Sequence, residues 1–276
     1  MRFIIKLACK YFFVYNKEDK DVMKLLAFER KDKILSEIKK NKKVHVSQLA
    51  KTFNVSEETI RRDLDKLEKE GIVDRSYGGA TLSQHTNEDL PYATRNIINV
   101  EEKKNIATKT TSLIKAGDSL IADTSSTVFE SLSLLAREKE NLTIITNSIT
   151  AVDLLSNFKV HLILTGGTLR TKSNSLVGSD AANTISRYYV DYAIISCKGL
   201  SMENGITDSN EPEAEVKNHM LKRANKVILV ADSSKFDRNA FIKIVDISEI
   251  DYLITDKEPS HEWQQFLKEK DVTLIY

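Results

Sequence analysis

The stretch that most restricts the fold of this chain is at residues 55–71, V-S-E-E-T-I-R-R-D-L-D-K-L-E-K-E-G. Ile60, Leu64 and Leu67 recur at intervals of four and three residues, so they form one apolar stripe on a helix. Ser56 precedes the stripe and can cap the helix by accepting a hydrogen bond from an amide of the first turn. The stretch therefore predicts an amphipathic helix that packs through one face.

The polar face of this predicted helix suits a DNA groove. Arg61 and Arg62 lie off the apolar stripe, and arginine binds guanine edges with two hydrogen bonds. Taken alone, the same charges fit a solvated surface helix equally well. The residues that we expect to contact DNA from this helix and the one before it are Ser47, Ser56, Glu57, Thr59, Arg61, Arg62 and Lys66.

The preceding residues favour DNA binding. Residues 46–53, V-S-Q-L-A-K-T-F, predict a short helix capped by Ser47, with Leu49 and Phe53 directed inward. Asn54 tolerates a turn conformation, and the next helix begins directly after it. Two short helices joined in this way predict a helix-turn-helix.

Two further segments complete a small domain at residues 25–82. Residues 29–39 predict a third helix, with Ile34 and Ile38 facing the core. Residues 72–82 have strand character around a glycine turn, which predicts the wing of a winged helix. The DNA contacts expected from this wing are Arg75, Tyr77, Gly78 and Gly79.

Composition agrees with a DNA-binding segment in a chain of several domains. The 276 residues suffice for two domains, and the formal net charge is only +1. Residues 23–82 nevertheless carry 14 Lys and Arg against 10 Asp and Glu, and such a local surplus favours binding to phosphates. The two cysteines, Cys9 and Cys197, predict no disulfide framework, which fits a cytoplasmic protein. We interpret Cys197 as a core residue.

Residues 1–22 and residues 83–100 are expected to lie outside the two domains. Within residues 1–22, the run from Phe3 to Val14 is apolar but interrupted by Lys6 and Lys10. It is too short to span a membrane and has no clear signal-peptide cleavage site. We expect Met23 to be the natural first residue and residues 1–22 to be a non-native extension. Residues 83–100 are polar and contain Pro91, so they predict a linker.

Residues 101–276 alternate between apolar runs and helical patterns. We expect strands at 119–123, 142–146, 160–164, 192–197, 226–231, 252–255 and 272–275, and helices at 103–114, 128–137, 149–157, 179–187, 212–224 and 260–268. This alternation predicts a layered α/β domain with a largely parallel sheet. Ligands of such sheets bind beyond the carboxyl ends of the strands.

Polar residues follow several of these predicted strands. The segment Asp123, Thr124, Ser125, Ser126 and Thr127 joins a strand to a helix, and hydroxyls with free helix amides suit a phosphate. An ordinary helix cap is equally compatible with it. Further ligand-binding candidates are Gly166, Gly167, Lys198, Gly199, Glu213, Lys217 and Lys235. Of these, the glycines are also compatible with a simple turn, and Glu213 and Lys217 with a surface ion pair.

In this order the pieces resemble the DeoR family of bacterial transcription regulators. The N-terminal matches are E-R-K-D-K-I-L, V-S-Q-L-A, residues 55–71 and R-S-Y-G-G-A, followed by D-T-S-S-T, T-G-G, S-L-V-G, G-I-T, E-A-E-V-K and A-D-S-S-K-F. The chain departs from the family at Tyr77, where histidine is frequent, and at Asp237, where glycine is frequent. The resemblance, over residues 23–256, implies a sugar-phosphate sensor domain similar to ribose-5-phosphate isomerase.

The expected function is a DNA-binding repressor of a sugar operon, released from its operator by a phosphorylated sugar. We expect a homo-oligomer, dimer or tetramer, because one winged helix covers little DNA. The alternative is an isomerase-like enzyme in which Asp123, Glu213 and Lys217 transfer protons. No nucleophile motif, metal-ligand cluster or cofactor motif is evident in the sequence, and no membrane partner is expected.

Overall fold

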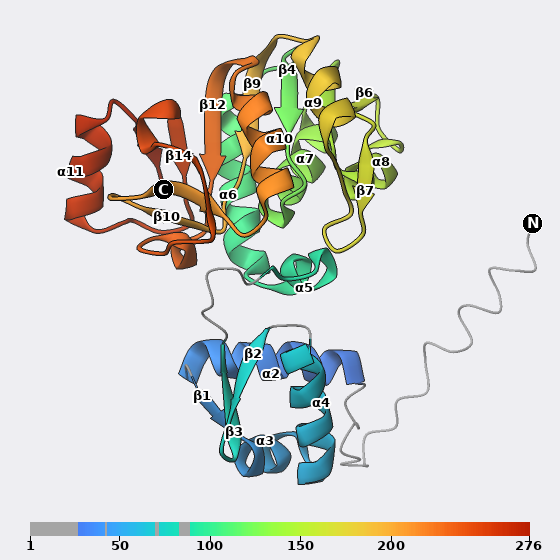
Figure 1. Cartoon of the computed structure of the whole chain (residues 1–276), viewed down its shortest axis with the longest axis vertical. Helices are drawn as coiled ribbons and strands as arrows, with labels where there is room; N and C mark the ends of the chain where they lie inside the picture. Colours follow the sequence, from blue (N-terminus) through green and yellow to red (C-terminus); the bar gives the residue numbers. More distant parts are fainter. Residues whose placement is uncertain (1–26, 42, 70–71, 83–88) are drawn as a thin grey trace, which may run out of the picture.

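A computed structural model describes residues 27–41, 43–69, 72–82 and 89–276. The expected extension at residues 1–22 lies outside these described residues. Residues 83–88 of the expected linker lie outside them as well. The chain forms a smaller N-terminal body and a larger α/β body (Figure 1). This arrangement confirms the predicted fold class.

The smaller body is a winged helix-turn-helix. It contains α2 (Ala27–Asn41), β1 (Lys43–His45), α3 (Val46–Phe53), α4 (Glu57–Lys69), β2 (Val73–Ser76) and β3 (Gly79–Leu82). The strands form an antiparallel sheet in the order β1-β3-β2, of which the sequence analysis missed β1. Ile34, Ile60 and Leu64 are fully buried, so the predicted stripe of α4 faces the core.

The ends of the two DNA-binding helices differ from each other. The amide of Thr59 donates to Ser56 Oγ at 3.2 Å, which confirms Ser56 as a cap, and Asn54 has a φ of 51° in the turn. The cap predicted at Ser47 is wrong. His45 precedes α3 in extended conformation without a side-chain cap, and Val46 N donates instead to Gly78 O in the wing at 2.8 Å.

The larger body is built on a seven-stranded sheet in the order β15-β14-β12-β9-β4-β5-β6. Its strands are β4 (Ser119–Ala122), β5 (Thr143–Thr146), β6 (His161–Leu164), β9 (Val190–Ile195), β12 (Ala224–Val230), β14 (Tyr252–Ile254) and β15 (Thr273–Ile275). Every neighbouring pair is parallel, as predicted. Parallel strands are usually covered on both faces, and that holds here.

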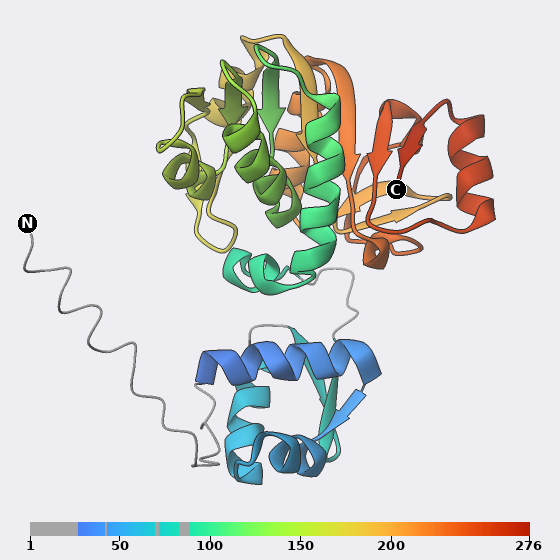
Figure 2. The same ribbon diagram turned by 180° about the vertical axis from the view of Figure 1, so that it is seen from behind.

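Two apolar cores lie on the two faces of the sheet. Helices α6 (Val100–Leu113), α7 (Ser126–Glu138) and α8 (Ile149–Leu155) cover one face, and α9 (Ser179–Ser186), α10 (Glu211–Leu221) and α11 (His261–Glu269) the other (Figures 1 and 2). Successive strand residues supply opposite cores: Leu120 and Ile194 pack with α7, whereas Ile121 and Ala193 pack with α9 and α10. This alternation follows from the two-residue period of a strand.

Several short elements were not predicted. The hairpin of β7 (Thr168–Arg170) and β8 (Ser175–Val177) and the three-stranded sheet of β10 (Gly199–Ser201), β11 (Gly205–Asp208) and β13 (Ile242–Val245) are too short to show a period. The segment predicted as a linker contains helix α5 (Tyr92–Ile97), whose Tyr92 is buried and packs edge-on against Phe129. In the part of the chain that is described, no helix has the length and apolarity to cross a membrane.

The wing offers a matched test of the fold. A Cβ at Gly79 would lie 2.0 Å from Val44 O, so Gly79→Ala must separate β1 from β3. At Gly78, with a φ of +75°, the space is open and alanine meets only backbone strain. We expect Gly79→Ala to lower the free energy of unfolding by about 3 kcal/mol and Gly78→Ala by about 1 kcal/mol. Thermal denaturation of the full chain measures both, and equal losses would contradict this reading of the wing.

Candidate functional site

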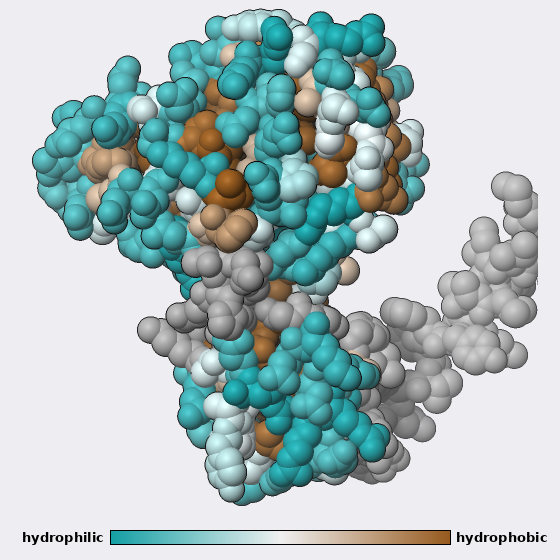
Figure 3. All heavy atoms as spheres, viewed as in Figure 1, coloured by the Kyte–Doolittle hydropathy of each residue, from teal (hydrophilic) through white to brown (hydrophobic). Residues whose placement is uncertain are grey.

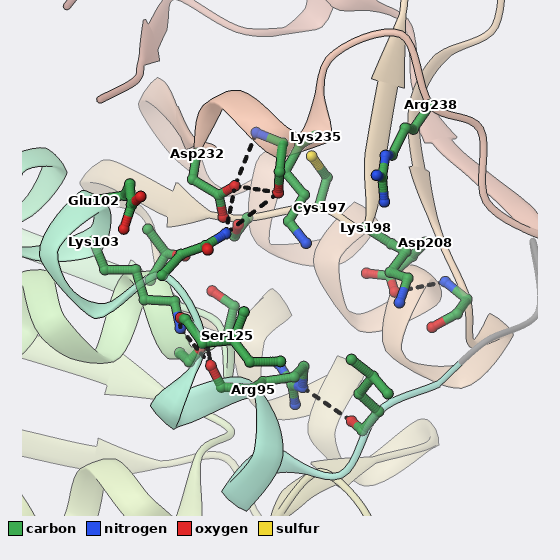
Figure 4. A pocket seen from close by; sticks show the side chains of 18 of the residues that line it. Arg95, Glu102, Lys103, Ser125, Cys197, Lys198, Asp208, Asp232, Lys235 and Arg238 are labelled. Carbon is green, nitrogen blue, oxygen red and sulfur yellow. Dashed lines mark hydrogen bonds between the residues drawn. The ribbon is translucent and has the colours of Figure 1, made fainter. Parts of the chain in front are cut away.

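A cavity of about 1010 Å³ lies beyond the carboxyl ends of β4, β9 and β12. Segments that follow these strands line it, together with α6, α10 and the segment around α5. Residues of the smaller body line it as well, namely Ile38, Lys43, Ile72, Asp74 and Thr81, so the cavity extends between the two bodies. Figure 4 shows Arg95 and Ser125 on one side of the cavity, with Lys235, Lys198 and Arg238 on the other. The position is the one expected for a ligand site in a parallel sheet.

The predicted ligand-binding residues divide into two groups. Those in the cavity lining are Thr124, Ser125, Ser126, Thr127, Lys198, Glu213, Lys217 and Lys235. Those not in it are Asp123, Gly166, Gly167 and Gly199. Two of the glycines serve packing instead: a Cβ would lie 2.6 Å from Val177 O at Gly167 and 2.5 Å from Arg238 O at Gly199.

The hydroxyl segment after β4 forms one wall of the cavity. The amide of Ser125 donates to Asp123 Oδ1 at 2.9 Å, and Ser125 Oγ caps α7 by accepting from Val128 N at 3.3 Å. Thr124 Oγ1 donates to Ser173 O at 3.1 Å. The first amides of a helix have no partner within the helix, so the start of α7 at Ser126 can receive an anion.

Lys217 is held beneath this wall by two carboxylates. Its ammonium lies 3.1 Å from Asp123 Oδ2, binds Asp208, and donates to Ser196 O at 2.8 Å. Burial disfavours the ammonium, but Asp208 and Asp123 outweigh burial and raise the pKa of Lys217. Burial likewise opposes the charged form of Asp208, yet Lys217 holds the pKa of Asp208 below its usual value. Lys217 therefore has a structural role in the cavity floor.

Glu213 connects the cavity to the segment around α5. Glu213 Oε1 accepts from Arg170 Nη1 at 3.1 Å and from Ser175 Oγ at 2.9 Å, and Arg170 also binds Asp89. Glu213 and Lys217 are both buried and have different ionic partners, so they are not a surface ion pair. The carboxylate instead joins α10 to the β7–β8 hairpin.

Five further cations that were not predicted from the sequence line this cavity: Lys43, Arg95, Lys103, Arg238 and Lys257. Of these, Arg95 and Arg238 carry guanidinium groups. Within the described part of the chain, no carboxylate lies within 4.0 Å of either guanidinium or of the Lys235 ammonium. The charge of Lys235 acts on Asp232: burial would raise the pKa of Asp232, but Lys235 and hydrogen bonds from Ser234 and Asn99 outweigh burial and lower it. The cavity is therefore suited to an anion.

Cys197 lines the cavity as a buried thiol. Burial raises the pKa of Cys197 to about 12, against which Lys235 and Lys217 have a smaller lowering effect. A thiol with such a pKa is protonated at neutral pH and is a weak nucleophile. Among the described residues, no group of His, Cys, Asp and Glu is arranged to hold a metal ion.

The second candidate site is the exposed face of α4 with the wing. Arg61 Nη2 lies 2.6 Å from Glu57 Oε2, and Arg62 Nε lies 3.3 Å from Glu58 Oε1. These ion pairs are solvent-exposed, so they cost little to exchange for DNA phosphates or bases.

The wing lies beside this face. Arg75 Nη1 lies 3.2 Å from Asp65 Oδ1 and donates to Arg61 O at 3.4 Å, which ties the wing to α4. Tyr77 is fully exposed at the wing tip, and the neighbouring Gly78 is exposed as well. Gly79, predicted as a DNA contact, is buried against the backbone of Val44. Its role is to let β1 approach β3.

The buried charges of the cavity floor predict a pH dependence. Because the pKa of Asp208 is lower in the folded chain, its stabilisation is present above about pH 4 and is lost as the pH falls through the folded-state pKa. We expect Asp208→Asn to be less stable than the wild type at pH 7 but to lose less stability between pH 5 and pH 3. Urea unfolding across this range measures the slopes. Asp180→Asn, on the exposed start of α9, is the control and should keep the wild-type slope; an unchanged slope in Asp208→Asn would contradict the assignment.

Comparison with known proteins identifies both domains of the chain. Residues 30–86 match the DeoR-like helix-turn-helix domain, and residues 98–257 match the DeoR C terminal sensor domain. An uncharacterized HTH-type transcriptional regulator, YulB of Bacillus subtilis, is 41% identical over 84% of this chain and 90% of its own length. The glycerol-3-phosphate regulon repressor of Escherichia coli is 30% identical over 89% of this chain and 97% of its own length.

Among solved structures, ribose 5-phosphate isomerase A from Neisseria gonorrhoeae aligns with 49% of this chain and 53% of its own chain, at 13% identity and a TM-score of 0.38. The family matches are far more extensive: they cover the helix-turn-helix with its wing and most of the α/β body. The helix-turn-helix, the anion-suited cavity and these matches lead to one conclusion. The chain belongs to the DeoR family of transcriptional regulators.

Proposed function

We propose that the protein is a DNA-binding repressor whose affinity for its operator is controlled by a phosphorylated sugar. The observation that carries this proposal is the cavity, in which Lys235 and Arg238 face the positive end of α7. A phosphate satisfies both features, because helix amides and cations each favour negative charge. The relative that is named as a glycerol-3-phosphate regulon repressor supports a phosphorylated effector.

The sugar itself needs partners other than those of its phosphate. Asp123 pairs with Lys217 and does not line the cavity, so we do not assign it to the ligand. Glu213 and Asp232 line the cavity, and ionised carboxylates accept hydrogen bonds from sugar hydroxyls. We propose that these two carboxylates orient the sugar.

An enzymatic role has less support. The alternative function assigned proton transfer to Asp123, Glu213 and Lys217. A catalytic base should have a pKa near the working pH. The two carboxylates around Lys217 raise its pKa and keep it charged, which opposes such a role. Asp123, buried behind the cavity wall, does not line the cavity.

Pairing of two chains would place two winged helices on one operator. Exposed apolar side chains occur on β6 and on the elements next to it in sequence, at Leu164 in β6, Ile149 in α8 and Leu169 in β7. Figure 3 shows apolar surface on the side of the larger body where β6 lies. Apolar surface of this kind marks a protein interface. We propose that the sensor domain associates with a second copy of itself, and sedimentation of the protein with and without operator DNA measures this.

Substitutions in α4 test the DNA-binding face. If Arg61 reads a base, Arg61→Ala should cost about 1–3 kcal/mol of operator binding and relax the sequence preference. If Arg62 contacts only phosphate, Arg62→Ala should weaken binding to all duplexes alike. The slope of log affinity against log salt concentration should then fall in magnitude by about 1. Fluorescence anisotropy with operator and scrambled duplexes measures both. The exposed Arg137, on the sensor domain, provides the control variant; unchanged affinity after loss of both α4 arginines would refute the assignment.

The effector is tested with a panel of glucose 6-phosphate, fructose 1-phosphate, fructose 6-phosphate, galactose 6-phosphate and glycerol 3-phosphate, each beside its unphosphorylated form. We expect at least one phosphate, and no free sugar, to raise the melting temperature and to weaken operator binding by five- to 150-fold, as for a coupling of about 1–3 kcal/mol. The double variant Ser126→Ala, Lys235→Ala should not respond. Preference for a free sugar, a normal response of the double variant, or product formation detected by NMR would contradict the proposal.

A further inference from the structure

The segment at residues 89–99, here called the connector, forms part of the cavity wall. It lies between the two domains and contains α5. Asp89 binds Arg170 at one end of it. At the other end, Asn99 Nδ2 donates to Asp232 Oδ1 at 3.1 Å and to Ser234 Oγ at 3.4 Å. The connector is thus fastened at both ends to residues around the cavity.

Arg95 is the cation of the connector that faces the cavity. Its Nε donates to Leu90 O at 3.2 Å, and its guanidinium carbon lies 5.6 Å from the centre of the Tyr92 ring. In the described part of the chain no carboxylate lies within 4.0 Å of this group. A guanidinium has five N–H donors, so donors remain beyond the Nε bond.

The backbone of Arg95 is fixed beside the hydroxyl wall. Arg95 O accepts from Ser126 Oγ at 3.3 Å and from the buried Lys103 ammonium. Ser126 is the first residue of α7, so the side chain of Arg95 begins close to the helix amides that suit an anion. Figure 4 shows Arg95 next to Ser125 at this wall. The charge of Arg95 also helps to lower the pKa of Asp208. Its effect is smaller than the raising effect of burial and the lowering effect of Lys217.

We propose that Arg95 is a ligand of the anion bound in the cavity, so that the effector is held partly by the connector itself. This inference rests on the proposed function and names the residue through which occupancy reaches the DNA-binding domain. Residue 95 lies outside both matched family segments, 30–86 and 98–257. A planar guanidinium can form two parallel hydrogen bonds to a phosphate, which fixes its orientation as well as its position.

The connector also contacts the DNA-binding domain. Leu90 and Ile98 pack against the apolar core that contains Ile34 and Leu64. A phosphate that draws Arg95 toward α7 therefore acts on the same short segment that supports the winged helix. A ligand shifts a conformational equilibrium only when it binds the two arrangements differently, and a ligand contact on the connector supplies that difference.

The test uses the full chain, with calorimetric titration of the panel phosphate that most stabilises the wild type. We expect Arg95→Ala to weaken binding about 10- to 100-fold, the loss of a charge-assisted hydrogen-bonded contact. Arg95→Lys keeps the charge without the planar fork, so its phosphate affinity should lie between those of the wild type and of Arg95→Ala. Arg137→Ala is the matched control and should bind as the wild type does. Operator affinity of Arg137→Ala without phosphate should stay within about two-fold of the wild type, because Arg137 lies in neither binding site.

Hydrogen exchange gives a readout that a merely structural role would not move. Phosphate should slow exchange of the amides at residues 93–99 in the wild type but not in Arg95→Ala. If Arg95→Ala binds the phosphate as tightly as the wild type, or shows the same slowing, the inference is overturned while the proposed function stands. If the wild type responds to no phosphate of the panel, the proposed effector class fails and this inference fails with it.

Discussion

The ammonium of Lys217 is the interaction on which the architecture of the cavity depends. It joins Asp123, directly after β4, to Asp208, at the end of β11, and to the carbonyl of Ser196 after β9. Three segments distant in sequence are thereby held at one edge of the sheet. A buried charge is costly unless it is paired and hydrogen-bonded. Here the ammonium pairs with both carboxylates and donates a hydrogen bond to the carbonyl.

Electrostatics also separates the cations of the cavity by role. Lys217 is neutralised by its two carboxylates, whereas Lys235, Arg238 and Arg95 face the open space without such partners. Basic residues in one cavity are therefore not interchangeable as anion ligands. Their availability depends on partners contributed by other parts of the chain.

The sequence predicted most of the fold but only the hydroxyl wall and four charged residues of the cavity, for reasons visible in particular residues. The stripe of Ile60, Leu64 and Leu67 is local and periodic, so α4 was predicted closely, and the apolar runs of the parallel sheet were equally clear. The strands β10, β11 and β13 are too short to show a period, and β13 pairs with β11 from a distant part of the chain, so they were missed. Asp237, in a place where the family often has glycine, has a φ of +56° and accepts a hydrogen bond from Trp263 Nε1 at 2.9 Å.

The ligand-binding residues were likewise predicted where the signal is local in the sequence and missed where it depends on distant contacts. The segment from Thr124 to Thr127 was found because it lies between a strand and a helix in the sequence itself. The engagement of Asp123 with Lys217 involves residues far apart in the chain, so a motif cannot reveal it. Arg95 was missed because the polar composition around it indicated a linker, whereas α5 is held by Tyr92 against α7.

The division of the sheet into two cores has a consequence for evolution. The side chains that pack the two faces come from the strands and helices, whereas much of the cavity lining comes from segments that follow strand ends. Exchange of a lining residue such as Arg238 or Glu102 removes no packing from either core, and surface substitutions of this kind usually change stability little. A scaffold of this construction can acquire a new ligand preference by a few substitutions while its folding remains intact.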